Sequence, residues 1–228
     1  MKIHRKTNRF AALFATVPLL AGPAAQAASV TILEPSFEGA AVTYVDWGFF
    51  SYGPLPSPWV VDGDFGAQTN TDTNDFYTVG PPQGDIFVYA NGEGYISQTL
   101  TTVLFPDTVY TLTVGVGYRK DMPGAGFPGY GIELWAGGSM LASDYDVGHD
   151  GTGAATPAAD EWKDAVVTYT SLPSVEPGQY LEIRLIGYGI QTNYDHVRLD
   201  ASPIPEPSAL AFAPLAVLGF AVRRRRAR

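Results

Sequence analysis

The chain has 228 residues, with 14 basic and 23 acidic side chains, a formal net charge of −9 and no cysteine. The lack of cysteine excludes disulfide cross-links, thiol nucleophiles and cysteine-ligated zinc. The 25 glycines, 18 prolines and 13% aromatic residues are typical of strands and turns rather than of helices.

The first 28 residues have the three parts of a secretory signal peptide. Basic residues stand within residues 2–9, an apolar run follows over residues 10–20, and Ala25-Gln26-Ala27 places small side chains before a cleavage site. We expect a signal helix that signal peptidase removes after Ala27, with Ala25 as the second position it recognises. The alternative is an N-terminal membrane anchor, which the shortness of the run and its prolines disfavour.

Residues between the two ends predict a single acidic domain over residues 29–202. Nine of the 14 basic residues lie in the first nine and the last six residues of the chain. Residues 10–222 keep only five basic residues and contain all 23 acidic ones, which gives them a net charge of −18. Such a surface repels nucleic acid and anionic lipid and attracts divalent cations, above all calcium. The alternative is that the acidity only keeps an exported protein soluble.

Short runs with period-two alternation, separated by turn residues, predict strands. They lie at residues 30–33, 85–89, 95–100, 108–118, 131–136, 139–142, 164–169, 180–186 and 194–200. Asn91-Gly92 and Gly137-Gly138 are expected to form the turns of two hairpins. The alternation in 180–186 places Leu181, Ile183 and Leu185 inside. We therefore predict an all-β, antiparallel β-sandwich of the jelly-roll type, with long loops at residues 50–79, 121–129 and 145–160.

The C-terminal segment, residues 203–228, carries a second processing pattern. Pro205-Glu206-Pro207 precedes an uncharged run over residues 208–222, and arginines follow at 223–226. A helix over this run spans about 22 Å at about 1.5 Å per residue, less than a bilayer core of about 30 Å. The arginines would hold its end on the cytoplasmic side. We expect the protein to touch the membrane only through this apolar helix.

This order of elements resembles the PEP-CTERM sorting signal. The resemblance implies processing by an exosortase near Pro205, Glu206 and Pro207, in a Gram-negative bacterium that makes extracellular polysaccharide. It also implies transient anchoring in the inner membrane and a final location at the cell surface or in the extracellular matrix. The alternative is a simple C-terminal anchor.

Four segments of the central domain resemble galactose-binding-like jelly rolls, a group that includes carbohydrate-binding modules and the Stig cyclases. They are residues 35–38 (PSFE), 96–100 (ISQTL), 110–114 (YTLTV) and 194–199 (YDHVRL), in that order. The resemblance implies that the first and last strands lie side by side and hold structural Ca²⁺, with Glu38 and Asp195 as ligands. Calcium needs six to eight oxygens, so backbone carbonyls would complete the set. The alternative is that both residues cap turns.

Aromatic side chains provide a candidate sugar-binding face, because sugars stack on flat rings. The candidates are Trp47, Trp59, Tyr89, Tyr118, Tyr130 and Trp135. Aromatic residues also fill sandwich cores, so only some of these are expected at the surface. Trp59, in a proline-rich loop, is the one most expected to face solvent.

The central domain shows no pattern typical of a catalytic site. Its two histidines are His149 and His196, and no GxSxG, HExxH or glycine-rich phosphate loop is present. We therefore expect a non-catalytic domain that binds extracellular polysaccharide or another matrix component. The alternatives are an enzyme of the cyclase or glycosidase type, which the resemblance to Stig cyclases leaves open, and a structural coat protein without a specific ligand.

Overall fold

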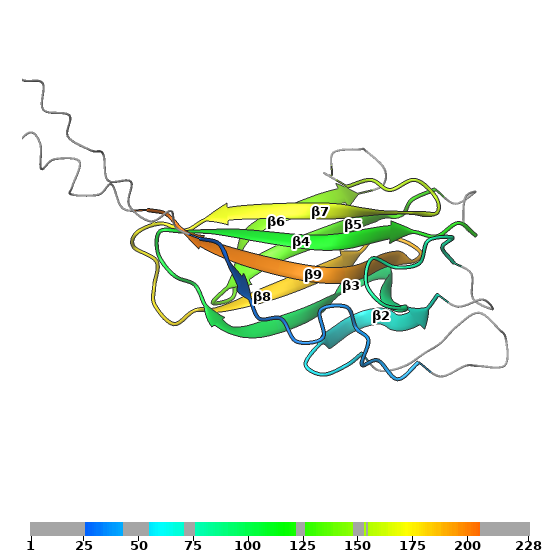
Figure 1. The fold of residues 1–228 in the computed structure, drawn as a ribbon, viewed down its shortest axis with the longest axis horizontal. Coiled ribbons are helices and arrows are strands. Elements are labelled where there is room, and N and C mark those ends of the chain that lie inside the picture. Colours follow the sequence, from blue (N-terminus) through cyan, green and yellow to red (C-terminus); the bar gives the residue numbers. More distant parts are fainter. Residues whose placement is uncertain are drawn as a thin grey trace, which may run out of the picture. The chain divides into compact units, whose positions relative to one another are not determined.

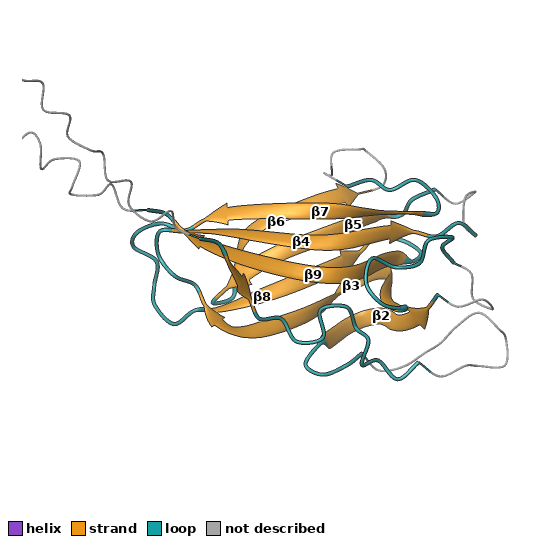
Figure 2. Ribbon diagram, viewed as in Figure 1, coloured by secondary structure: helices purple, strands orange, loops and turns teal. Residues whose placement is uncertain are grey.

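The computed structural model describes residues 26–42, 55–70, 76–121, 126–147, 153 and 155–205, and these contain strands and loops but no helix (Figure 2). The strands are β1 (Ala28–Val30), β2 (Val60–Thr69), β3 (Ile86–Val103), β4 (Thr108–Tyr118), β5 (Gly129–Ala136), β6 (Ser139–Val147), β7 (Glu161–Thr170), β8 (Tyr180–Gly187) and β9 (Thr192–Pro203). All pairings between them are antiparallel.

The strands follow the order β6-β5-β8-β3-β9-β4-β7, with β1 on β9 and β2 on β3 (Figure 1). β3 belongs to both layers of the sandwich. Val88–Ala90 pair with β9, whereas Tyr95–Thr99 pair with β8. The chain thus forms an all-β, antiparallel sandwich, as the alternating pattern predicts.

Two of the predicted local patterns are confirmed closely. β4 has the predicted bounds, and Leu112, Val114 and Val116 on one of its faces are fully buried. Gly137 and Gly138 join β5 to β6, with φ angles of 57° and 78°. A two-residue turn with positive φ at both positions matches the twist of the hairpin it connects, and glycine adopts this conformation without strain.

The hairpin predicted at Asn91-Gly92 is wrong, because β3 runs through this sequence as one strand of 18 residues. β2 pairs with β3 on both sides of Gly92, and its register shifts between Asp62 and Asp64. Positive φ angles at Gly92 and Gly94 absorb this irregularity within the strand. β2 itself lies in the predicted 50–79 loop. Its sequence, VVDGDFGAQT, lacks the alternation by which strands are recognised.

Candidate functional site

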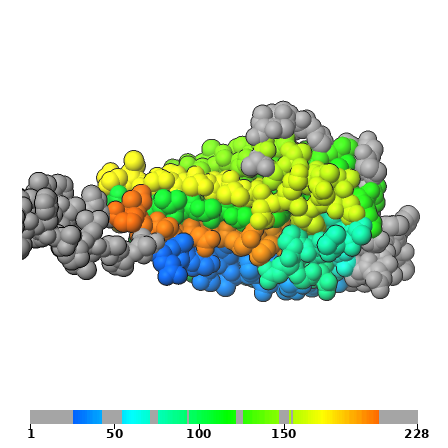
Figure 3. Space-filling view, turned by 45° about the horizontal axis from the view of Figure 1, so that its top comes forward, coloured from blue at the N-terminus to red at the C-terminus, as the bar shows by residue number. Residues whose placement is uncertain are grey.

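Residues 76–85, called here the covering segment, lie across the outer face of β4 and β9 (Figures 1 and 3). Gly115 and Gly117 make this close approach possible. A Cβ atom on Gly117 would lie 2.5 Å from the hydroxyl oxygen of Tyr77, and one on Gly115 would lie 3.0 Å from Pro82. Both glycines point away from the core that Val114 and Val116 enter, because side chains alternate along a strand.

An aromatic cluster fixes the start of the covering segment. The ring of Tyr77 lies 4.7 Å from that of Trp162 and 5.5 Å from that of Phe87. The guanidinium of Arg119 lies 3.9 Å from the centre of the Phe76 ring and forms an ion pair with Asp121. Ring contacts therefore bind the segment to β3 and β7, and a cation–π contact binds it to Arg119, the residue that follows β4.

Beneath the covering segment lies a group of buried polar side chains. Asn193 donates a hydrogen bond of 2.6 Å from Nδ2 to the hydroxyl of Tyr77, and burial raises the pKa of Tyr77 so that it stays neutral. Among the described residues, no partner is found for Oδ1 of Asn193, Nε1 of Trp162 or either amide atom of Gln68. Buried polar atoms without partners are costly, so this site suits a molecule that supplies the missing hydrogen bonds.

A surface groove of about 860 Å³ runs beside this polar group. Val79–Pro82 of the covering segment form one wall, and Asp160–Asp164, which include Trp162, form the other. The carboxylate of Asp160 accepts hydrogen bonds of 2.6 Å from both the backbone N–H and the hydroxyl of Thr78, and these bonds lower its pKa. Asp160 thereby ties the covering segment to the rim of the groove.

Glu38 and Asp195 both form hydrogen bonds to the end of the covering segment. They belong to the first and last of the four segments that resemble galactose-binding-like jelly rolls. Asp195 accepts hydrogen bonds from the backbone N–H groups of Gln83 (2.8 Å) and His196 (2.6 Å). Glu38 accepts them from Asp85 (3.1 Å) and Ile86 (2.9 Å). Burial raises the pKa of Asp195 to about 7, and the negative charge of Glu38 adds to this effect.

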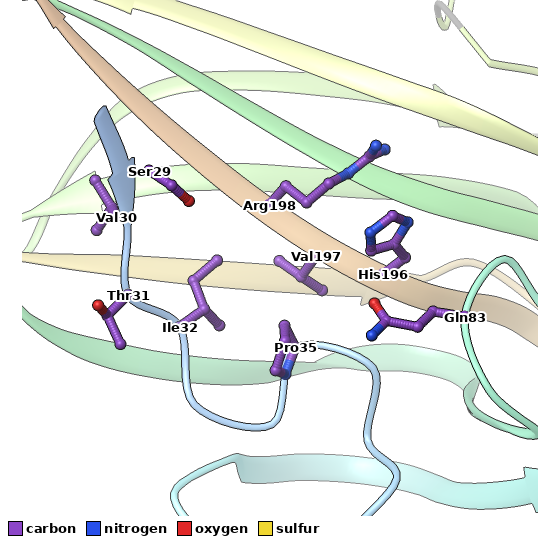
Figure 4. Close-up of a pocket in the computed structure, with 9 residues that line it drawn as sticks. All are labelled: Ser29, Val30, Thr31, Ile32, Pro35, Gln83, His196, Val197 and Arg198. Atoms are coloured by element: carbon purple, nitrogen blue, oxygen red, sulfur yellow. The ribbon is translucent and has the colours of Figure 1, made fainter. Parts of the chain in front are cut away.

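A second, smaller pocket of about 240 Å³ lies between the N-terminal segment and β9 (Figure 4). Pro35, Gln83 and His196 are among the residues that line it. His196 has a positive φ of 51°, and the register of β9 on β4 shifts at this point. This irregularity turns the backbone N–H of His196 toward the neighbouring Asp195 carboxylate.

The expectation that Trp59 faces solvent is wrong. Its side chain is only 6% exposed, and its ring lies 5.0 Å from that of Phe37. Its Nε1 donates to the carbonyl oxygens of Leu33 (3.1 Å) and Glu34 (3.0 Å). Trp59 is therefore a core residue that fixes the segment leading to Glu38.

The other predicted aromatic residues do not form an exposed platform within the part of the chain that is described. Tyr89 and Tyr130 are buried, as is Tyr118. Trp135 is half-buried on the outer face of β5, where the Arg184 guanidinium lies 3.9 Å from its ring centre. Trp47 lies outside the described residues, as does His149.

The predicted processing positions lie at the edges of the described range. Ala27 and Pro205 are exposed, whereas Ala25, Glu206, Pro207 and the 208–222 run lie outside the described residues. Within the residues that are described, there is no apolar helix of membrane-spanning length.

Sequence reasoning missed the residues that the covering segment brings together. Tyr77 and Gln68 fall in the predicted 50–79 loop, and Asn193 and Trp162 lie just outside the predicted strands. The signal that could have found them is Gly115-Val116-Gly117. Two glycines on one face of a buried strand indicate a close approach by another part of the chain.

Comparison with known proteins identifies relatives of this fold. Residues 28–200 match the HpiC1-like family, described as HpiC1 cyclase. No curated protein matches. The Stig cyclase Fisc from Fischerella sp. TAU, solved with an indole compound, is 28% identical with a TM-score of 0.65, covering 79% of this chain and all of its own. The carbohydrate-binding module TmCBM61 is more distant, at 19% identity and a TM-score of 0.43, covering 74% of this chain and 95% of its own.

A second cyclase structure, the apo form from Fischerella sp., has the same identity and TM-score and covers 79% of this chain and 98% of its own. Both the family and these two neighbours are cyclases, which contradicts the prediction of a non-catalytic domain. The matched region includes every described strand apart from the last residues of β9. The chain belongs to the HpiC1-like cyclase family.

Proposed function

We propose that this protein is a cyclase that closes a ring on an indole-containing substrate bound beneath the covering segment. The observation that carries the proposal is the set of unpartnered polar atoms of Asn193, Trp162 and Gln68. Trp162 packs against an aromatic cluster that includes Tyr77 and Phe87, Asn193 is bonded to Tyr77, and Gln68 is paired with Phe87 in the sheet. Membership of the cyclase family supports the reaction class. Two complexes of similar cyclases support the substrate class. The ligand of Fisc is a 3H-indole, and that of a cyclase from Fischerella sp. TAU is 4-(1H-indol-3-yl)butan-2-one.

The chemistry of these residues suits an indole. The rings of Tyr77, Phe87 and Trp162 offer apolar faces on which a flat bicyclic ring can stack. Oδ1 of Asn193 is an acceptor for an indole N–H, and the Tyr77 hydroxyl can donate its own hydrogen to a carbonyl or imine of the substrate. Ring closure by rearrangement is an isomerisation, so it requires no oxidant, reductant or second substrate.

Entry to this site requires the covering segment to move. Tyr77 and Asn193 are almost fully buried, and the adjoining groove is the route by which a substrate would reach them. Val79–Pro82 is the part of the segment that lines the groove, and its Gly80 has a φ of 79° that glycine tolerates. We expect this stretch to open and then close over the bound substrate, which would exclude water from the reaction.

The test is a binding and turnover experiment with the purified protein. The compound 4-(1H-indol-3-yl)butan-2-one is the binding probe, measured by calorimetry, and a panel of indole substrates is screened for products of unchanged mass and altered retention time. Asn193→Leu removes the amide at similar volume and should weaken binding about tenfold, the value of one buried hydrogen bond. Thr113→Val, which lies on the same outer face of β4 away from the cluster, is the control. Absence of both binding and isomerisation would contradict the proposal.

Calcium at Glu38 and Asp195 is proposed as a structural cofactor. The two carboxylates repel each other at the end of the covering segment, and a bound cation would remove that repulsion. No cluster of three or more acidic or histidine side chains occurs among the described residues, so backbone carbonyls would supply the remaining ligands. The role of such an ion would be to fasten residues 83–86 to β9 and to the N-terminal segment.

Export and sorting are proposed from the sequence of the two ends. Signal peptidase would cleave after Ala27, and an exosortase would process the chain near Pro205-Glu206-Pro207. The cyclase domain would then act at the cell surface or in the extracellular matrix. Mass spectrometry of the mature protein from its native host would test both cleavages. Extracellular polysaccharide as a further partner stays a prediction.

A further inference from the structure

Four apolar side chains are exposed at one end of the sandwich and form what we call the apolar tip. Phe105 is 53% exposed, Leu172 65%, Tyr180 57% and Ile204 41%. They come from the loop between β3 and β4, the loop between β7 and β8, the start of β8 and the residue after β9. Scattered apolar side chains are normal at a protein surface, whereas a group gathered at one end of a domain is a candidate interaction surface.

Hydrogen bonds between the segments hold these side chains at the same end. The hydroxyl of Ser171 donates to the carbonyl of Phe105 (2.7 Å), and the N–H of Leu104 donates to the carbonyl of Gln179 (2.8 Å). The N–H of Ile204 donates to the carbonyl of Asp107 (2.6 Å). Ile204 is itself a tip residue, whereas Ser171 and Gln179 are the chain neighbours of Leu172 and Tyr180. All three are thus bonded to the loop between β3 and β4. The apolar tip is thus a fixed part of the fold.

The chain leaves the domain at this tip. Ile204 follows the end of β9, and only residues 205–207 separate it from the uncharged run 208–222. A fully extended chain advances about 3.3–3.6 Å per residue, so at most about 14 Å of chain separates Ile204 from the first residue of that run. Figure 1 shows the start of β1 at the same end as the last residues of β9.

We propose that the apolar tip rests on the surface of the lipid bilayer into which residues 208–222 insert. Phenylalanine and tyrosine favour the boundary between headgroups and acyl chains, and leucine and isoleucine add apolar contact there. The loops at residues 103–108 and 171–180 contain Asp107 and Glu176 but no lysine or arginine. The contact is therefore apolar and suits zwitterionic lipid, since acidic loops are repelled by anionic headgroups. This surface is distinct from the proposed cyclase site. The proposal depends on insertion of the C-terminal run, and it replaces the expectation that the protein touches the membrane only through the apolar helix.

The absence of cysteine allows the proposal to be tested by single-cysteine labelling of the full-length chain. Leu172→Cys and Val79→Cys are each labelled with a small fluorophore and reconstituted in phosphatidylcholine vesicles with or without brominated acyl chains. Val79 is the matched control, because it is 88% exposed and lies in the groove beside the opposite end of β7. Leu215→Cys, within the C-terminal run, reports insertion of that run.

We expect bromine to quench the labels at 172 and 215 several-fold more than the label at 79. Adding Tyr180→Ser should reduce quenching at 172, whereas Val166→Ser, an exposed position in the middle of β7, should not. Quenching at 215 but not at 172 would overturn the proposal while leaving membrane insertion intact. A label at 172 that is shielded from aqueous iodide without being quenched by bromine would also overturn it, because protein would then cover the tip. Quenching at neither 172 nor 215 would overturn both the proposed contact of the tip with the bilayer and the insertion of residues 208–222.

Discussion

The side-chain amide of Asn193 and the hydroxyl of Tyr77, which are 116 positions apart in the chain, are joined by a hydrogen bond of 2.6 Å. Asn193 belongs to β9, whereas Tyr77 belongs to the segment that lies across it. This bond therefore connects the body of the sandwich to the part of the chain that closes the proposed substrate site.

Replacing Tyr77 with phenylalanine tests how much this connection contributes. The variant keeps the ring contacts with Trp162 and Phe87 but leaves the Asn193 amide without its acceptor. We expect a loss of about 1–3 kcal/mol in the free energy of unfolding, measured by urea denaturation. Tyr180→Phe, at an exposed tyrosine, should change it by less than about 0.5 kcal/mol. Equal changes in the free energy of unfolding for Tyr77→Phe and Tyr180→Phe would show that the Tyr77–Asn193 hydrogen bond does not stabilise the fold.

A methyl group at Gly117 should displace the covering segment. The added Cβ would lie 2.5 Å from the Tyr77 hydroxyl and 2.8 Å from the Trp162 ring, so Gly117→Ala should destabilise the protein by about 1–3 kcal/mol. The nearest atoms at Gly115 are 3.0 Å away, and Gly115→Ala should have the smaller effect. Limited proteolysis gives the second readout. Cleavage within residues 76–85 should be faster in Gly117→Ala, and unchanged cleavage would contradict this account of the glycine.

The stability of the metal-free protein should depend on pH through Asp195. Its pKa is raised to about 7 in the folded state, so the folded protein favours the protonated form. The contribution of Asp195 to stability should therefore be greatest below about pH 3.9, the pKa of aspartate in the unfolded chain. This contribution should decrease as the pH rises toward 7. The total contribution is at most about 4 kcal/mol, at about 1.4 kcal/mol per pH unit. The measurement is the melting temperature between pH 4 and 8. The control is Asp195→Asn, whose melting temperature should not show the decrease with pH that Asp195 causes.

Calcium should reverse that trend. At pH 7.5 we expect Ca²⁺ to raise the melting temperature of the unsubstituted protein, since it would bind the folded state selectively. At pH 5 the effect should be smaller, because protonated Asp195 is a poor ligand. Glu38→Gln and Asp195→Asn should both abolish the response at pH 7.5. A melting temperature that does not change with calcium at either pH would rule out the metal site.

Trp59→Phe distinguishes a core tryptophan from a sugar-binding one. Loss of the Nε1 donor to the carbonyls of Leu33 and Glu34 should cost about 1–2 kcal/mol in the free energy of unfolding. Trp135→Phe, at a half-buried position, should cost less. Binding to soluble glycans should be the same for the two variants and for the parent protein. Selective loss of glycan binding in Trp59→Phe would show that this ring contacts a ligand.

The strands that could be predicted are those in which one face is buried. β4 and β8 alternate between buried and less buried residues, so their bounds follow from the sequence. β2 could not be recognised, because its glycines and aspartates interrupt the pattern and its partner β3 determines its course. The Asn91-Gly92 turn signal fails for the same reason: pairing with strands distant in sequence overrides a local preference.

The proposed substrate site could not be predicted from the sequence for a different reason. Glu38 and Asp195 can be proposed as calcium ligands from the sequence, because they stand in segments that resemble a known fold. Tyr77 and Asn193 stand in no such segment, and their role depends on a loop that crosses a sheet face. Trp59 shows the opposite error. A tryptophan among prolines resembles a surface residue, yet its N–H group and ring complete the core.

The sharing of β3 between the two layers has a consequence for how the protein opens. The layers are not independent sheets held by side-chain packing alone, since one strand carries backbone hydrogen bonds into both. Separating them would require those bonds to break together with the core. The amides of Val88–Thr99 should accordingly be among the slowest to exchange with deuterium. Amides of the covering segment should exchange faster, because the proposed opening of that segment leaves the sheet intact. If the proposed function is correct, the protein would admit a substrate at one face without loosening the sandwich that supports it.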